Sequence, residues 1–193
     1  MQPQAIPYLT EEEYLEFERN SEIKHEYFDG EIFAMSGASR KHNLIVANVI
    51  FSLMSQVRQR PCRVYPSDMR LKIETTKLYT YPDVMIICGH DELFADNKED
   101  MLLNPDVIIE VLSDSTENYD RGKKFEHYRK IVSLKEYVLI SQNTRKIERF
   151  LKTEHLRWIS DETDEEHTEI ILESVGCALN LDEVYDKVFT IEP

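Results

Sequence analysis

The sequence has few cysteines, no long apolar run and no linker rich in glycine, proline or serine. Its three cysteines, Cys62, Cys88 and Cys177, are far apart and form no CxxC pair, which argues against a disulfide framework and against a zinc site. No apolar run approaches the ~20 residues that span a bilayer, and the first residues lack both the basic and the apolar part of a secretion signal. We therefore expect a cytoplasmic protein with reduced thiols and no membrane partner.

The chain has 193 residues, enough to bury most of its apolar surface in one domain. Hydrophobic residues make up 41% of it and charged residues 31%, as in ordinary globular proteins. We find no internal repeat and no low-complexity segment that would divide the chain. The sequence therefore predicts a single domain over residues 1–193.

The formal net charge of −14 argues at first against nucleic-acid binding, because phosphate neutralisation needs Lys and Arg. The charge is unevenly distributed, however. Residues 154–193 hold twelve acidic and two basic side chains, a net charge of −10, whereas residues 40–77 and 121–152 carry +6 and +7. The two basic stretches could form a positive surface if the fold brings them together. The alternative is that they are ordinary solvated faces.

Local signals predict the first elements. Thr10 and Glu13 have the capping-box spacing at the start of a helix expected at about residues 11–20. The dipeptide Asp29-Gly30 suits a tight turn between two short strands. A longer helix is expected at about residues 40–58, where apolar side chains recur at three- and four-residue steps. These side chains are Leu44, Ile45, Val49, Leu53, Met54 and Val57.

Strand-like segments follow the second helix. Two of them, YPDVMIICG at 81–89 and PDVIIEVLS at 105–113, are apolar and rich in β-branched residues, as buried central strands are. A third helix is expected at about 117–131, with Phe125, Tyr128 and Val132 on its apolar face, and further strands come after it. The order of elements predicts an α/β fold with a mixed β-sheet flanked by helices.

Each of the two apolar strands contains a carboxylate, which is rare in a core unless the acid is paired or binds a cation. Alternation places Asp83 on one face with Met85 and Ile87, and Glu110 on one face with Leu112. If the strands are neighbours, the two acids approach each other and need a proton or a cation between them. Oxygen ligands favour Mg²⁺ or Mn²⁺. The alternative is a buried acid satisfied by backbone amides or by an arginine.

The third helix offers a cation of the protein itself. Asp120, Lys124 and Tyr128 lie four residues apart on one stripe, next to the apolar face. The Lys124 stem can therefore pack at the buried edge while its ammonium group reaches inward. Lys123 points about 100° away, at ~3.6 residues per turn, and is expected in solvent. A simple Asp120–Lys124 pair on the helix surface is the alternative.

Several runs of this sequence resemble the Uma-type family of restriction endonucleases. They are YPDVMIIC, PDVIIEVLSDST, YDRGKKFEHYRKIVSLKEYVLI, and KHEYFDGEIFAMSGAS with the following His42. The resemblance extends from about Tyr8 to Tyr185. Because that family belongs to the PD-(D/E)XK nucleases, it implies a restriction-endonuclease-like core and metal-dependent hydrolysis of phosphodiester bonds in nucleic acid, DNA in particular.

The resemblance also implies a set of site residues. Pro82-Asp83 matches the PD element and Glu110 the (D/E) position, so these two acids are expected to bind Mg²⁺ or Mn²⁺. The superfamily commonly has lysine two residues later, where this chain has Leu112. The resemblance places the lysine at Lys124 instead, and Glu26 matches a further acid. The expected catalytic residues are thus Asp83, Glu110, Lys124 and Glu26.

In the expected mechanism the metal polarises a phosphate oxygen and lowers the pKa of a bound water. Lys124 would orient that water or help to deprotonate it, and would offset charge on the phosphorus. His42 and Tyr128 are supporting candidates. Three further basic residues could contact the phosphate backbone; they are Arg63, Arg70 and Lys72.

Two other functions stay open. Leu112 and the acidic C-terminal region also fit a catalytically inactive nucleic-acid-binding or regulatory domain of the same fold. A glycoside hydrolase also uses two carboxylates, although a chain with one tryptophan offers no array of sugar-stacking rings. The sequence does not determine the oligomeric state, and a homodimer is one possibility.

Overall fold

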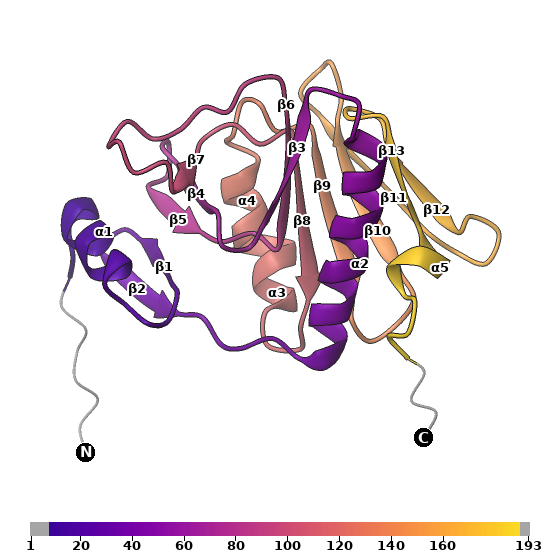
Figure 1. The fold of residues 1–193 in the computed structure, drawn as a ribbon, viewed down its shortest axis with the longest axis horizontal. Coiled ribbons are helices and arrows are strands. Elements are labelled where there is room, and N and C mark those ends of the chain that lie inside the picture. Colours follow the sequence, from indigo (N-terminus) through magenta and orange to yellow (C-terminus); the bar gives the residue numbers. More distant parts are fainter. Residues whose placement is uncertain (1–7, 190–193) are drawn as a thin grey trace.

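A computed structural model describes residues 8–189 of the chain (Figure 1). The helical elements are α1 (Glu11–Arg19), α2 (Arg40–Val57), α3 (Glu117–Tyr119), the π-helical turn η1 (Asp120–Lys124), α4 (Phe125–Tyr128) and α5 (Leu181–Val184). The strands before α3 are β1 (His25–Phe28), β2 (Glu31–Ala34), β3 (Cys62–Pro66), β4 (Arg70–Ile73), β5 (Leu78–Thr80), β6 (Val84–Cys88), β7 (Met101–Leu102) and β8 (Val107–Leu112). The later strands are β9 (Glu136–Ser141), β10 (Ile147–Lys152), β11 (Trp158–Glu162), β12 (Glu169–Leu172) and β13 (Cys177–Asn180).

A six-stranded mixed sheet forms the centre of the fold, in the order β11-β10-β9-β8-β6-β3. Strands β8 and β9 are parallel and all other neighbours in this sheet are antiparallel. Both β6 and β8 are almost wholly buried and are neighbours, as their apolar composition predicted. The predicted α/β fold with a mixed sheet flanked by helices is confirmed.

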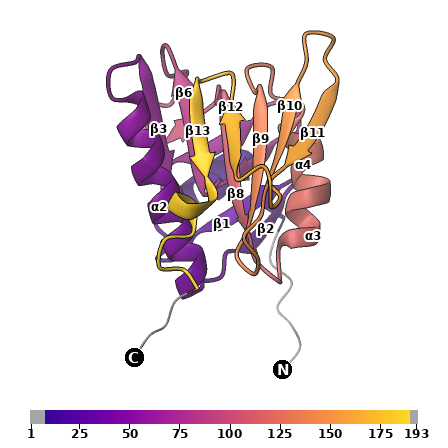
Figure 2. The same cartoon turned by 90° about the vertical axis from the view of Figure 1, so that its right-hand side faces the viewer.

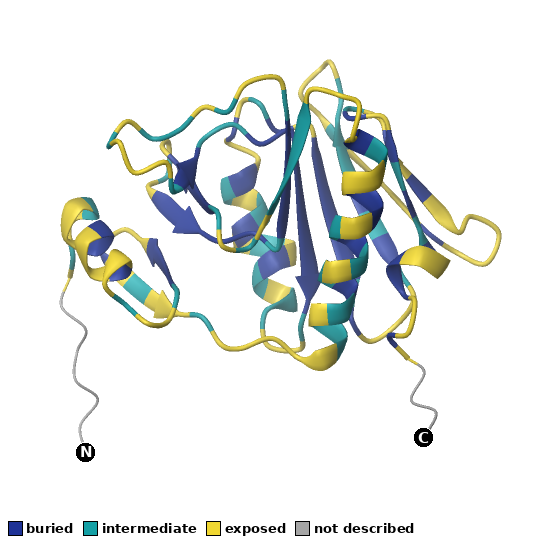
Figure 3. Cartoon of the chain, viewed as in Figure 1, coloured by how far each residue is buried: buried dark blue, intermediate teal, exposed yellow. Residues whose placement is uncertain are grey.

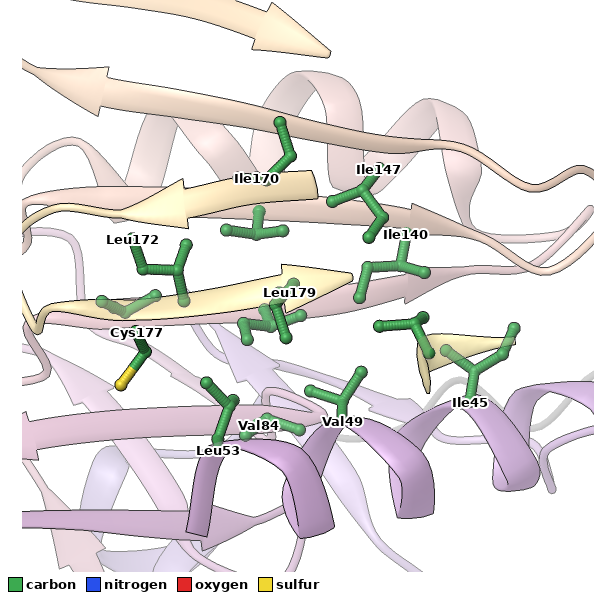
Figure 4. Close-up of a cluster of buried hydrophobic side chains, with 14 of the residues drawn as sticks. Ile45, Val49, Leu53, Val84, Ile140, Ile147, Ile170, Leu172, Cys177 and Leu179 are labelled. Atoms are coloured by element: carbon green, nitrogen blue, oxygen red, sulfur yellow. The ribbon is translucent and has the colours of Figure 1, made fainter. Parts of the chain in front are cut away.

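The two faces of this sheet are covered differently. One face packs against α2, α5 and the β12–β13 hairpin, and Figure 4 shows Ile45, Val49 and Leu53 of α2 within this cluster. The opposite face packs against α4 and a second sheet, whose Leu71 and Leu78 join that core. Figure 2 shows α2 and α3–α4 on opposite sides of the central strands. Each residue of β8 therefore faces one of two separate cores.

The second sheet has the order β2-β1-β5-β4-β7. With α1 it lies on the left in Figure 1, on the side of the central sheet away from α2. Helix α1 begins with the predicted capping box between Thr10 and Glu13. The β1–β2 hairpin turns at Asp29 and Gly30, whose φ angles of 46° and 90° explain the choice of these residues. Figure 3 shows that β2 is largely exposed, in contrast to the central strands.

Two helix predictions need correction. Helix α2 matches the prediction, but Met54 is 56% exposed and does not belong to its buried face. The expected helix at 117–131 is interrupted by the π-helical turn and ends by Tyr128. Because the chain turns there, Val132 is 91% exposed and Ile131 packs into the core in its place.

The cysteine prediction is wrong for two residues. Cys62 of β3 and Cys88 of β6 lie opposite each other in the sheet register and form a disulfide. The third cysteine, Cys177, is buried and has a free thiol. The two cysteines are 26 residues apart in the sequence, so their pairing could be seen only once β3 and β6 were known to be antiparallel neighbours. The expected reduced state of all three thiols therefore does not hold.

The two basic stretches receive little support as one positive surface. The central sheet separates α2, which lies in the first stretch, from α4, which lies in the second (Figure 1). Much of their charge is also neutralised within the chain, as in the ion pair of Arg121 with Glu148 and that of Arg149 with Asp161. Within residues 8–189, no helix combines the length and the apolar character that crossing a bilayer requires.

Candidate active site

The two acids predicted from the central strands lie at neighbouring strand ends. In the antiparallel pair of β6 and β8, Val84 lies opposite Ile109 and Met85 opposite Ile108. Asp83 comes just before β6, and the same register places it beside Glu110. The Asp83 Oδ2 atom accepts a hydrogen bond of 2.7 Å from the backbone N–H of Val111. This bond fixes the Asp83 carboxylate beside the residue that follows Glu110.

Lys124 brings its ammonium group to the same place. Its Nζ atom lies 2.9 Å from Glu110 Oε1, 3.3 Å from Glu26 Oε1 and 3.5 Å from Asp120 Oδ1. The side chain is buried, whereas that of Lys123 is exposed. Lys124 thus points inward, as its position on the helical stripe predicted. Its amine forms ion pairs with three acids and not with Asp120 alone.

Residues 120 and 124, which are four apart in the sequence, both face inward from the π-helical turn. Asp120 and Lys124 are its first and last residues, and both are buried. The Tyr137 hydroxyl of β9 donates a 3.0 Å hydrogen bond to the Asp120 carbonyl and so anchors the turn to the central sheet. Such single π-turns are rare and occur often at functional sites. The four-residue spacing of Asp120, Lys124 and Tyr128 gave no signal for such a turn.

Burial and charge act against each other in this cluster. Burial raises the pKa of Glu110 to about 8, although the Lys124 amine opposes this effect. Burial also raises the pKa of Asp120. Burial alone would lower the pKa of Lys124, but the neighbouring carboxylates, Glu110 foremost, raise it well above its ordinary value. Lys124 is therefore held in its charged form, and burial favours the protonated form of Glu110.

Three other side chains hold these groups in position. The Tyr128 hydroxyl donates a 2.6 Å hydrogen bond to Glu110 Oε1. Glu26 Oε1, on β1 of the second sheet, accepts a hydrogen bond from the Thr80 hydroxyl. His42, in the first turn of α2, has its Nε2 atom 3.1 Å from Asp83 Oδ2. Since Asp83 accepts from Val111 as well, Nε2 is the protonated nitrogen in this arrangement.

The two strand acids keep oxygens free for a cation. Within residues 8–189, Asp83 makes its hydrogen bonds through Oδ2 and Glu110 through Oε1, which leaves Asp83 Oδ1 and Glu110 Oε2 without a hydrogen-bond partner. The same residues contain no group of three or more His, Cys, Asp or Glu side chains placed to hold a metal. Mg²⁺ is commonly bound by one or two carboxylates and completes its shell with water and substrate phosphate. The pair Asp83 and Glu110 fits that pattern.

Not every predicted contact residue reaches the site. Arg63 binds Asp91 and the Gly89 carbonyl near the other end of β6. Arg70 is buried against Tyr81, and Lys72 is buried in an ion pair with Glu11. The burial of these two side chains and their partners within the chain give no support to the expected phosphate contacts.

Leu112, at the position where the superfamily commonly has lysine, is 4% exposed and packs in the core on the Glu110 face of β8. Two contact residues went unnoticed in the sequence. Thr80 gave no signal, because its hydrogen bond to Glu26 depends on how the second sheet is assembled. Tyr119, whose ring centre lies 6.0 Å from the Lys124 amine, precedes the π-turn and could have been found only from that turn.

Comparison with known proteins places the chain in a family. A family model described as "Uma2: Putative restriction endonuclease" matches residues 11–182. Two proteins of Synechocystis sp. (strain ATCC 27184 / PCC 6803 / Kazusa) are similar to it. "Uncharacterized protein sll1609" is 38% identical over 84% of this chain and 91% of its own length, and "Uncharacterized protein slr1290" is 34% identical over 93% of each.

A solved structure shares the fold. The crystal structure of "a putative nuclease belonging to DUF820" from Anabaena variabilis ATCC 29413 superposes with a TM-score of 0.76. The match covers 94% of this chain and 99% of that one at 20% sequence identity. The family model spans most of the described residues, including all four predicted catalytic positions. The chain therefore belongs to the Uma2 family.

Proposed function

We propose that this protein is an endonuclease that hydrolyses phosphodiester bonds of nucleic acid, DNA in the first place, with Mg²⁺ or Mn²⁺. The observation that carries the proposal is the contact of the buried Lys124 amine with Glu110, next to Asp83, with one free oxygen on each of the two strand acids. Family membership supports the same reaction class. A purely structural ion pair of Lys124 with Glu110 would not need the partly exposed Asp83 beside it.

In this proposal Asp83 and Glu110 hold the cation, which supplies Lewis acidity toward a phosphate oxygen and lowers the pKa of a bound water. The Asp83 carboxylate is held ready by Val111 and His42, and the Glu110 carboxylate by Tyr128. Glu110 must release its proton to act as a ligand, because a carboxylate binds metal in its ionised form.

Lys124 acts through its charge. The neighbouring acids raise the pKa of Lys124 and keep its amine protonated, so in this proposal it does not act as a base toward water. As an ammonium group it acts as a hydrogen-bond donor. Its amine stabilises negative charge that develops on the phosphate in the transition state. Glu26 and Asp120 hold the amine in place from two further elements, β1 and the π-turn.

The test is nicking of supercoiled plasmid by the full chain in Mn²⁺, in Mg²⁺ and in EDTA. The proposal expects nicking with either metal, none in EDTA, and a strong loss in Lys124→Met but not in Lys123→Met. Lys123 is a matched control because it is the adjacent lysine of the same turn and is exposed. Metal-independent nicking would refute the proposal.

The catalytically inactive nucleic-acid-binding domain is the second candidate, favoured by Leu112 at the usual lysine position. It predicts that the parent protein binds DNA without cutting it in any metal. Retained binding without nicking would therefore select this candidate.

A further inference from the structure

The β1–β2 hairpin presents one face to the candidate active site. Glu26 and Phe28 are two residues apart in β1, so their side chains lie on the same face of the strand. Glu26 Oε1 lies 3.3 Å from the Lys124 amine, and the Phe28 ring meets His127 at 4.8 Å between ring centres. Both contacts are with the helical segment that follows β8. This face of the hairpin therefore forms one wall of the site.

Phe33 belongs to the same wall. It lies directly opposite Glu26 in the antiparallel register of β1 and β2, and opposite residues of such a pair put their side chains on the same face, about 5 Å apart at Cβ. Strand β2 is the outer strand of its sheet, and Phe33 is 48% exposed. A large apolar ring thus stands half exposed beside Glu26, the acid that holds the Lys124 amine.

The charges around this ring disfavour the backbone of a paired duplex. Glu31, on the same face of β2, is exposed, and the Lys124 charge is already opposed by three acids. The whole chain carries −14. Duplex binding draws most of its sequence-independent affinity from Lys and Arg on phosphates, which this wall does not offer. Aromatic stacking supplies affinity without that charge, provided the base is free of its own stack.

We propose that Phe33 stacks on an unpaired base of the substrate next to the scissile phosphate, so that the enzyme acts on single-stranded or locally unpaired DNA. This inference rests on the proposed nuclease function and adds its substrate class. The base lies against Phe33 while the adjoining phosphate reaches Lys124, because Phe33 and the Lys124 partner Glu26 are cross-strand neighbours. Specificity for the unpaired state then resides in the hairpin and not in the central sheet.

The first experiment measures stacking without cleavage. Short DNA strands with a single 2-aminopurine, either unpaired or in a full duplex, are titrated with the full chain in EDTA. The unpaired probe should be quenched by the parent protein, and Phe33→Ala should bind it about tenfold more weakly. Phe33→Tyr should retain the quenching, because the ring is kept. Phe51→Ala is the matched control, since Phe51 is an exposed phenylalanine, 78% accessible, on the outer side of α2.

The second experiment measures cleavage of the same strands in Mn²⁺. Phe33→Ala should cut the unpaired strand about tenfold more slowly than the parent, with Phe33→Tyr and Phe51→Ala unchanged. No quenching by the parent, or equal binding and cutting by Phe33→Ala, overturns the proposal. The proposal is also overturned if Phe33→Ala slows cutting of the full duplex as much as cutting of the unpaired strand, because the ring would then insert between stacked base pairs of a duplex. Quenching that depends on Phe33 in a protein that never cuts refutes the nuclease function and leaves the stacking site standing.

Discussion

Replacing Lys124 by methionine is the change whose consequences follow most directly from the structure. Methionine keeps the length of the apolar stem and removes the charge. Three carboxylates lie within 3.5 Å of the amine, and all of them are largely buried. Breaking a buried ion pair by removing one partner costs about 3–5 kcal/mol. Because burial raises the pKa of Glu110 to about 8 and so weakens its charge at neutral pH, we expect the lower end, about 3 kcal/mol at pH 7.

The cost should depend on pH. Without the amine, Glu110 and Asp120 lose the cation that opposes the effect of burial, so the pKa of each should rise further. An acid with a raised folded-state pKa stabilises the fold at low pH and loses that contribution as pH rises through the raised value. Lys124→Met should therefore be close to the parent at pH 5 and clearly less stable at pH 8. Urea unfolding in EDTA at both values measures this difference.

The effect on cleavage should exceed the effect on folding. Loss of one electrostatic stabiliser of a transition state costs about 10²–10³ in rate, and the metal ligands stay in place. Initial nicking rates at saturating Mn²⁺, measured on folded protein, give the number, with Lys123→Met as control. Parental activity in Lys124→Met would refute the assigned role. Activity in Lys124→Met together with an inactive Lys123→Met would show that the other lysine of the turn is the functional one.

Three further changes test neighbouring parts of the account. Glu110→Gln should abolish nicking. In EDTA its stability relative to the parent should rise with pH above about 4.5, by roughly 1 kcal/mol per pH unit at most, because the raised pKa of Glu110 makes its ionisation unfavourable in the folded state. A difference that does not change with pH would contradict this. Glu165→Gln with Glu166→Gln, in the exposed loop after β11, should tighten DNA binding most at low salt, and a salt-independent change would exclude a gating role. Leu112→Lys in the Lys124→Met background should restore part of the nicking rate, because Leu112 lies on the same face of β8 as Glu110. No recovery would mean that a lysine at position 112 does not reach the place of the Lys124 amine.

The central strands and the first helices were predictable because their signals are local. The capping box at Thr10 and the turn at Asp29-Gly30 each lie within a few residues and were confirmed, as was the apolar period of α2 apart from Met54. The C-terminal β13 and α5 were missed, since both are short and their buried residues pack mainly on α2 and the central sheet. The Cys62–Cys88 disulfide depends on register across two strands, which periodicity does not encode.

The candidate site divides in the same way. Asp83 and Glu110 were accessible as acids in apolar strands, and Lys124 as a lysine beside a buried stripe, so their proximity could be predicted from alternation and helical spacing. Glu26 was suggested only by family resemblance, because its approach to Lys124 requires the second sheet to pack against the π-turn. The π-turn itself has no pattern in the sequence, and Thr80 depends on both.

The proposed reaction requires that Asp83 and Glu110 together bind the divalent cation. Anomalous diffraction from crystals of the full chain grown with Mn²⁺ can locate that cation. We expect a manganese peak within coordination distance of the free oxygens, Asp83 Oδ1 and Glu110 Oε2, and its loss in Glu110→Gln. A manganese peak held by other residues, or no peak at this pair under conditions in which the protein nicks DNA, would contradict the claim.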